Sequence, residues 1–427
     1  MPRKSNILLG LVAATFFAQV MIYGLGSAGQ IRRDEEIQRL RQLVDEVQPA
    51  VAELAGFPAG EPVEVAMKTR EEVRQYMIRS VRISNPGGDL TRRGRCFAML
   101  GLLPEGYDLE AGMVDLVTEQ AGGLYDPFSD EFWGILDMPS SMKSVSYQKL
   151  IASHELTHAL QDRETDMVEL LDVFVANPDY EYAFRSVIEG MATMVMFAYT
   201  QGVDLDEVQD AGSTMRAAFS QKAGNPSLSA YSESPTYVKE LLISPYAEGG
   251  AFVEEWHRAR PDLEFAALMN SIPASSEQIL HPEKYLTPDA PTVIDLSPVD
   301  AAVPEAWHLF HATTLGEFDL VTLFSIHEET SSAAAEIAAG WDGLRLRAFE
   351  DLDGGVAVLG SSVWDSEEDA REFQGAFSTL MAKVNGPDRF AVVLRGHVVD
   401  FVIGTSEAYT RRAMLVALEN LAQRDEI

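Results

Sequence analysis

The chain has 427 residues, of which 46% are hydrophobic, so it can bury a substantial core and form two or more domains. Its 66 acidic and 33 basic residues give a formal net charge of −33, which argues against nucleic acid as a partner and against binding of anionic lipid by the body of the protein. A single cysteine, Cys96, excludes an intrachain disulfide and a thiolate-rich zinc site.

The chain begins with a basic tetrapeptide, followed by a run without charge from Ser5 to Ile31. About 20 apolar residues span a bilayer as a helix, whereas the apolar part of a signal peptide usually has about 7–15. We therefore expect residues 1–31 to form a signal anchor, and the small residues 26–29 leave cleavage as a signal peptide open. In both cases the rest of the protein is expected outside the cytoplasm, membrane-anchored by the N-terminal helix or secreted.

Three patterns precede the part of the chain that carries chemistry. Apolar residues from Ile37 to Val47 predict an amphipathic helix that Pro49 interrupts or restarts, and residues 62–69 alternate as in a strand. Further on, residues 122–136 hold two short apolar runs around a turn that contains Pro127, which predicts a β-hairpin.

Residues 153–162 read Ser-His-Glu-Leu-Thr-His-Ala-Leu-Gln-Asp and contain an His-Glu-x-x-His motif. The surrounding segment, 147–160, has no Gly or Pro and an apolar stripe, so it predicts a helix. On a helix, the rings of His154 and His158 leave the same face one turn apart and can share one zinc ion. Glu155 would then act as the general base for water without being a ligand. The alternative is a surface helix turn whose residues match the motif by chance.

A second helix is predicted from Tyr182 to Tyr199, with Glu189 and Gly190 among bulky apolar residues. An unpaired buried charge costs several kcal/mol, and Gly costs about 1 kcal/mol relative to Ala in a helix. A metal would compensate the charge of Glu189, and Gly190 would let another backbone or the substrate approach. Glu189 is therefore the candidate third ligand, and the alternative is a carboxylate on the surface of the helix.

These residues resemble the gluzincin clan of zinc metallopeptidases. The segment 154–159 is similar to the active-site helix of thermolysin-like enzymes, and a glutamate on a later helix, here Glu189, is the arrangement of the clan. The resemblance covers about residues 100–290. It implies a mainly helical zincin-like catalytic domain with a small edge sheet, a bound Zn²⁺ ion, and a peptide or protein substrate.

The resemblance also makes expectations for the surroundings of the metal. Members of the clan commonly have an acidic residue one turn after the third ligand, where this chain has Thr193. Asp162, one turn after His158, is the expected replacement as the outer partner of the ligands. The hairpin at 122–136 is expected beside the metal helix, where its edge strand would bind a substrate peptide in extended form.

Two later segments extend the resemblance. Residues 245–249, Pro-Tyr-Ala-Glu-Gly, are similar to the Pro-Tyr-Glu-x-Gly segment of the aminopeptidase N family, which implies that Tyr246 stabilises the oxyanion. A core tyrosine is the alternative. Residues 277–285 are similar to a segment of uncharacterised bacterial and archaeal metallopeptidases, where His281 is a candidate second oxyanion donor or a helix-end histidine stacked on Tyr285.

The composition changes after this segment. Residues 287–314 are rich in proline and predict a linker. Residues 315–427 predict a smaller α+β domain, with hairpin turns at 353–354 and 396–397 and a final helix that extends to Leu421. Because no cluster of His and carboxylate residues occurs there, we expect this domain to serve in docking or partner binding.

The sequence thus predicts an α+β protein with a signal segment (1–31), a zincin-like metallopeptidase domain (32–286), a linker (287–314) and a C-terminal α+β domain (315–427). The predicted function is that of a zinc-dependent peptidase. The alternative is a membrane-anchored binding or scaffold protein on a degenerate peptidase fold whose metal is structural or absent. A metal hydrolase that acts on esters or lipids would share the same ligands.

Overall fold

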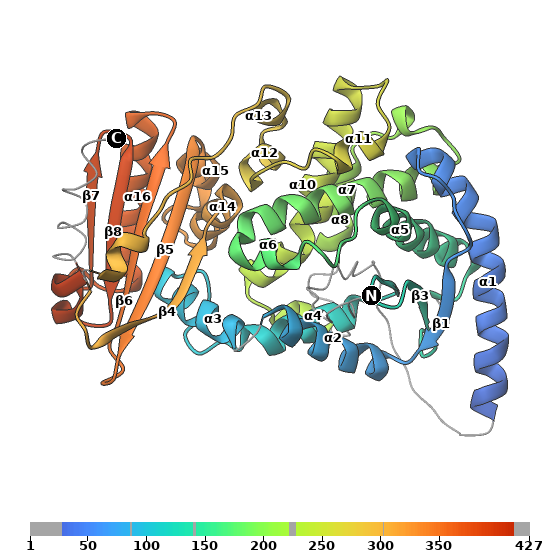
Figure 1. The fold of residues 1–427 in the computed structure, drawn as a ribbon, viewed down its shortest axis with the longest axis horizontal. Helices are drawn as coiled ribbons and strands as arrows, with labels where there is room; N and C mark the ends of the chain where they lie inside the picture. The colour runs from blue at the N-terminus through green and yellow to red at the C-terminus, as the bar shows by residue number, and fades with distance from the viewer. Residues whose placement is uncertain (1–27, 86–87, 140–141, 222–227, 302, 414–427) are drawn as a thin grey trace.

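A computed structural model describes residues 28–85, 88–139, 142–221, 228–301 and 303–413. The predicted signal segment lies outside these ranges, except for its last four residues, and so does the end of the predicted final helix. Within the described ranges, no helix combines the length and the apolar character that crossing a bilayer requires. The fold is mixed α+β, with a mainly helical N-terminal region beside a C-terminal region built on an antiparallel sheet (Figure 1).

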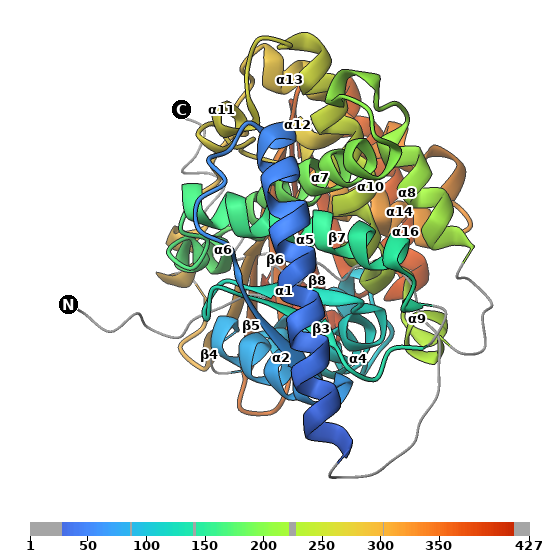
Figure 2. The same ribbon diagram turned by 90° about the vertical axis from the view of Figure 1, so that its right-hand side faces the viewer.

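The helices of the N-terminal region follow one another in this order: α1 (Ala28–Ala55), α2 (Arg70–Ser84), α3 (Asp89–Leu100), α4 (Leu109–Gln120), α5 (Val145–Glu164), α6 (Leu171–Ala176), α7 (Pro178–Gln201), α8 (Ala211–Ser220), α9 (Ser229–Glu233), α10 (Thr236–Ala259), α11 (Phe265–Met269), α12 (Ser276–Leu280) and α13 (Pro282–Leu286). Helix α1 packs along α5 on one side of the region (Figure 2). It continues through Pro49, where the sequence predicted an interruption. Burial of Val47 and Val51 on both sides of this proline offsets the lost hydrogen bond.

A three-stranded sheet in the described part of this region contains β1 (Glu64–Lys68), β2 (Gly123–Asp126) and β3 (Glu131–Ile135), in the order β1-β3-β2. Strand β1 is parallel to β3, and β2 is antiparallel to it. The predicted hairpin at 122–136 is therefore confirmed as β2 and β3. Strand β2 is an edge strand of this sheet and lies against α5.

Local sequence fixes the first residues of α5 and α7, the helices that carry the predicted metal ligands. Ser144 caps α5, because its side chain accepts a hydrogen bond from the backbone of Tyr147. Asn177 caps α7 in the same way, and Pro178 occupies the first turn, where its missing N–H has no consequence. Helix α7 ends at Gly202 in the left-handed conformation (φ 70°).

Helices α7 and α10 approach each other so closely that only glycine fits at their contact. A Cβ atom on Gly190 would lie 2.3 Å from the carbonyl oxygen of Gly249, and a Cβ on Gly249 would lie 2.0 Å from that of Ser186. The expectation that Gly190 lets another backbone approach is therefore confirmed. The approaching backbone is that of α10, and it brings Tyr246, one turn before Gly249, next to the helix that carries Glu189.

The C-terminal region has a five-stranded antiparallel sheet in the order β4-β5-β6-β8-β7. Its elements are β4 (Trp307–Thr314), α14 (Glu317–Ile326), α15 (Ala334–Ala338), β5 (Trp341–Asp351), β6 (Val356–Trp364), α16 (Glu367–Val384), β7 (Phe390–Arg395) and β8 (Val398–Gly404). The two predicted hairpins are confirmed as β5-β6 and β7-β8. Residues 307–314 were predicted to belong to the proline-rich linker, and this prediction is wrong, because they form the edge strand β4.

One hydrophobic core runs through both regions, from Val44 in α1 to Ile403 in β8. Helix α14 connects them, because it packs on α15 within the C-terminal region and on α10 and α12 of the helical region. The ring of Phe318 in α14 stacks on Tyr182 in α7, with ring centroids 4.2 Å apart. The C-terminal region thus packs directly on the helix that carries Glu189.

Asp179 at this junction is expected to make the stability depend on pH. Its carboxylate accepts a hydrogen bond from the backbone of Ser276 at 3.0 Å, and Asp319 and Glu317 lie nearby. Burial, together with the neighbouring carboxylates, raises the pKa of Asp179 to about 7. Because the folded state then binds the proton of Asp179 more tightly than the unfolded chain does, the contribution of this group to stability is fully present below about pH 4. It is lost as the pH rises through about 7, by up to about 4 kcal/mol.

Asp179→Asn should reduce this pH dependence, since asparagine keeps an acceptor for Ser276 without a charge. Urea unfolding of the full chain at several pH values between these limits measures the effect. Asp388→Asn, on an exposed turn, serves as the matched control and should unfold like the wild type. An unchanged slope in Asp179→Asn would mean that Asp179 is not the titrating group.

Candidate metal centre

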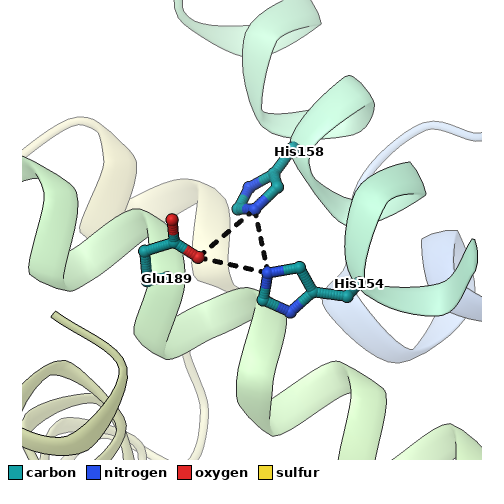
Figure 3. Close-up of side chains that lie close together, drawn as sticks. All are labelled: His154, His158 and Glu189. Carbon is teal, nitrogen blue, oxygen red and sulfur yellow. Dashed lines mark hydrogen bonds and ion pairs between the residues drawn. The ribbon is translucent and has the colours of Figure 1, made fainter. Parts of the chain in front are cut away.

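Three side chains predicted as metal ligands converge on one point (Figure 3). His154 and His158 come from neighbouring turns of α5, and Glu189 comes from the middle of α7. The Nε2 atom of His154 lies 3.1 Å from Oε2 of Glu189 and 3.1 Å from Nε2 of His158, and His158 Nε2 lies 3.5 Å from the same carboxylate oxygen. Among the described residues, this buried group is the one that could hold a metal ion.

The two histidines stabilise the negative charge of Glu189. Its side chain is fully buried, and its ion-pair partners are His154 and His158. Burial alone would raise the pKa of Glu189, but the hydrogen bonds from the two imidazoles outweigh it and hold the pKa well below its usual range. The site therefore presents an ionised carboxylate, which is the form that binds a cation.

Gln161, rather than Asp162, is the outer partner of His158. Its Nε2 donates to the backbone oxygen of Ile188 at 3.1 Å, so its Oε1 atom faces Nδ1 of His158 at 2.8 Å. Nδ1 of His158 therefore donates to Gln161, which leaves Nε2 as the ring atom that faces Glu189 and would bind a metal ion. The sequence missed Gln161, although its position three residues after His158 on a buried face was a signal for it. Asp162, the expected partner, contacts Tyr125 instead.

Glu155, the predicted general base, lies beside the ligands and is held by the edge strand. It is fully buried, and its Oε2 atom accepts a hydrogen bond of 2.9 Å from the backbone N–H of Tyr125 in β2. The predicted position of the hairpin beside the metal helix is thus confirmed. The contact also means that the N–H of Tyr125 is already occupied by the carboxylate of Glu155.

Tyr246 lies at the site, as its resemblance to the aminopeptidase segment implied. Its ring stacks on that of His154, with centroids 5.7 Å apart and planes 20° from parallel. Burial raises the pKa of Tyr246 well above its usual value, and the charges of Glu189 and Glu155 add to this effect. The phenol therefore keeps its proton and can act as a hydrogen-bond donor.

The remaining catalytic candidate, His281, and the position of the missing acidic residue, Thr193, have different surroundings. His281, between α12 and α13, pairs with Glu317 of α14 at 2.9 Å and is not part of the group of three ligands. The ring of Tyr285 packs against Phe252, so the expected stacking of His281 on Tyr285 is replaced by another contact. Thr193 is fully buried, and its hydroxyl has no hydrogen-bond partner among the described residues.

Comparison with known proteins adds information on the C-terminal region. Residues 308–416 match a family model described as a domain of unknown function (DUF8575). The candidate metal centre lies outside this match. The match begins within β4, which agrees with the strand being part of the C-terminal sheet. No curated protein and no solved structure matches the chain.

Proposed function

We propose that this protein is a zinc-dependent peptidase of the gluzincin type. The observation that carries the proposal is the convergence of His154, His158 and Glu189, with Glu155 following His154 on the same buried helix. A motif of five residues can occur by chance on one helix. The approach of a buried glutamate from a second helix to the same point requires a separate set of tertiary contacts, so chance is a poor explanation for both together.

The donor set fits zinc. Two imidazole nitrogens and one carboxylate oxygen are typical of catalytic zinc sites, whereas magnesium and calcium prefer oxygen ligands. Zinc bonds of about 2.0–2.1 Å in a tetrahedral arrangement separate two ligand atoms by about 3.3 Å. The three separations of 3.1, 3.1 and 3.5 Å agree with this value. A zinc ion held there would supply a Lewis acid and lower the pKa of water.

The surrounding residues have clear roles in such a reaction. Glu155 would take a proton from the attacking water and later pass it to the leaving amine. The hydroxyl of Tyr246 would donate a hydrogen bond to the carbonyl oxygen of the substrate as negative charge develops on it. The backbone N–H of Tyr125 would keep the carboxylate of Glu155 in place during these transfers.

The zincin-like fold and the peptide substrate belong to the same proposal. They are supported by the gluzincin-like set of residues on α5 and α7 and by the position of the small sheet, whose strand β2 lies against α5. The proposed location outside the cytoplasm and the membrane anchor rest on the apolar run in residues 5–31.

A binding or scaffold protein with a structural metal is the second candidate, and burial favours it. The exposed fractions of His154, His158 and Glu189 are 1%, 4% and 0%, and Glu155 is equally enclosed. A structural metal is surrounded by protein in this way, whereas a catalytic one needs an open position for water and substrate.

Two measurements on the purified full chain separate these functions. Metal analysis gives the zinc content per chain, and digestion of casein or a peptide library with and without a chelator gives the activity. One zinc ion per chain with chelator-sensitive cleavage supports the peptidase. Stoichiometric zinc without cleavage supports the scaffold, and a chain that binds no zinc would contradict both assignments of the site.

A further inference from the structure

We propose that Tyr125 is a positioning residue that holds the general base through two hydrogen bonds to α5, one from its backbone to Glu155 and one from its hydroxyl to Asp162. We call this arrangement the Tyr125 bridge. The proposal rests on the proposed peptidase function, because it assigns a role to residues around Glu155. It also gives Asp162 a role other than the one that the sequence predicted.

The geometry of the bridge is specific. The backbone N–H of Tyr125 lies 2.9 Å from Oε2 of Glu155, and its hydroxyl lies 2.8 Å from Oδ2 of Asp162. Both acceptors are on α5, seven residues apart, which corresponds to two turns or about 10 Å along the helix. Tyr125, a buried residue of the edge strand, therefore contacts the catalytic helix at two points that are two turns apart.

Both ends of the bridge are well defined. In the β2-β3 hairpin Tyr125 is opposite Phe132, and its N–H points away from the partner strand toward α5. A buried N–H needs an acceptor, and Glu155 provides it. At the other end, Oδ1 of Asp162 accepts a hydrogen bond from the backbone of Met167 at 3.0 Å, so the second oxygen is directed at the phenol.

The bridge should affect turnover more than binding. The phenol of Tyr125 bonds to Asp162 and not to a metal ligand, so its loss should leave the metal bound. It should let β2 move relative to α5, however, and the carboxylate of Glu155 would lose its fixed orientation. Removal of a hydrogen bond that orients a reacting group commonly lowers activity about 10- to 100-fold.

The test compares kcat, KM and zinc content for Tyr125→Phe, Asp162→Ala and the double variant, with Asp162→Asn as the conservative change. We expect the two single variants to lose about 10- to 100-fold in kcat, with KM and zinc content unchanged. The double variant should be no worse than Asp162→Ala alone, because that change already removes the hydrogen bond that Tyr125→Phe removes. Asp162→Asn should keep most of the activity, because its oxygen can accept the hydrogen bond from Met167 while its amide NH2 donates to the phenol oxygen of Tyr125.

A matched control and a second readout separate positioning from stability. Tyr237→Phe removes a phenol hydroxyl bonded to a buried carboxylate, that of Asp319 at 2.8 Å, at the junction with α14. It should lose stability as Tyr125→Phe does, with kcat unchanged. Amide hydrogen exchange of residues 122–127 should become faster in Tyr125→Phe and Asp162→Ala but not in the control.

Wild-type kcat in Tyr125→Phe, an additive double variant, or unchanged exchange at 122–127 would each overturn the bridge. If the wild-type chain cleaves no peptide, the proposed function fails. In that case, amide hydrogen exchange of residues 122–127 in the variants and the wild type still tests whether the hydroxyl of Tyr125 holds its backbone N–H against α5.

Discussion

Glu155→Gln is expected to leave one zinc ion bound per chain and to lower kcat by about 10³-fold. Glutamine has the same size, and its oxygen can still accept the hydrogen bond from Tyr125. It cannot take a proton from water, so the variant removes the base and little else. Metal analysis and peptide-cleavage kinetics on the same preparation measure the two expected results together.

Two further variants give this experiment its contrast. Glu164→Gln changes an exposed carboxylate near the end of the same helix and should behave like the wild type. His158→Ala should lose zinc and activity together, since it removes a ligand. Full activity in Glu155→Gln would refute the proposed mechanism, and loss of zinc from it would mean that Glu155 supports the metal instead of the reaction.

Much of this site could be predicted because single helices fix its parts. Residues four apart on a helix must share a face, so the pairing of His154 with His158 required only that the segment be helical. Glu189 could be found because a charge in an apolar stripe needs a partner, and the Gly190 beside it indicated close packing. These are local patterns, and the structure agrees with each of them.

The parts that could not be predicted depend on contacts between distant segments. Gln161 and Asp162 differ by about 100° around α5, and only the position of α7 decides which one faces His158. Glu155 is held by Tyr125, which is 30 positions earlier in the chain and belongs to a different element. Strand β4 was missed because it follows a proline-rich segment and becomes a strand by pairing with β5.

Gly190→Ala is the substitution from which we expect the largest loss of stability. Its new methyl group would lie 2.3 Å from the carbonyl oxygen and 2.5 Å from the carbonyl carbon of Gly249. Both atoms belong to the backbone of α10, so no side-chain rotation can relieve the overlap, and α7 must move away from α10. We expect unfolding to become easier by about 3 kcal/mol or more, measured by urea denaturation.

The same movement should reach the metal centre, because Glu189 precedes Gly190 on α7 and its carboxylate must stay within 3.1–3.5 Å of both histidines. Zinc affinity should therefore fall even though no ligand is changed, and titration with a competing chelator would measure this.

Gly375→Ala is the matched control: its methyl group would meet no atom within 4 Å on the exposed face of α16. That variant should gain about 1 kcal/mol from the higher helix propensity of alanine, with zinc affinity unchanged. If Gly190→Ala, like Gly375→Ala, unfolds at a higher urea concentration than the wild type, α7 and α10 are not in direct backbone contact. The position of Tyr246 beside Glu189 then needs another explanation.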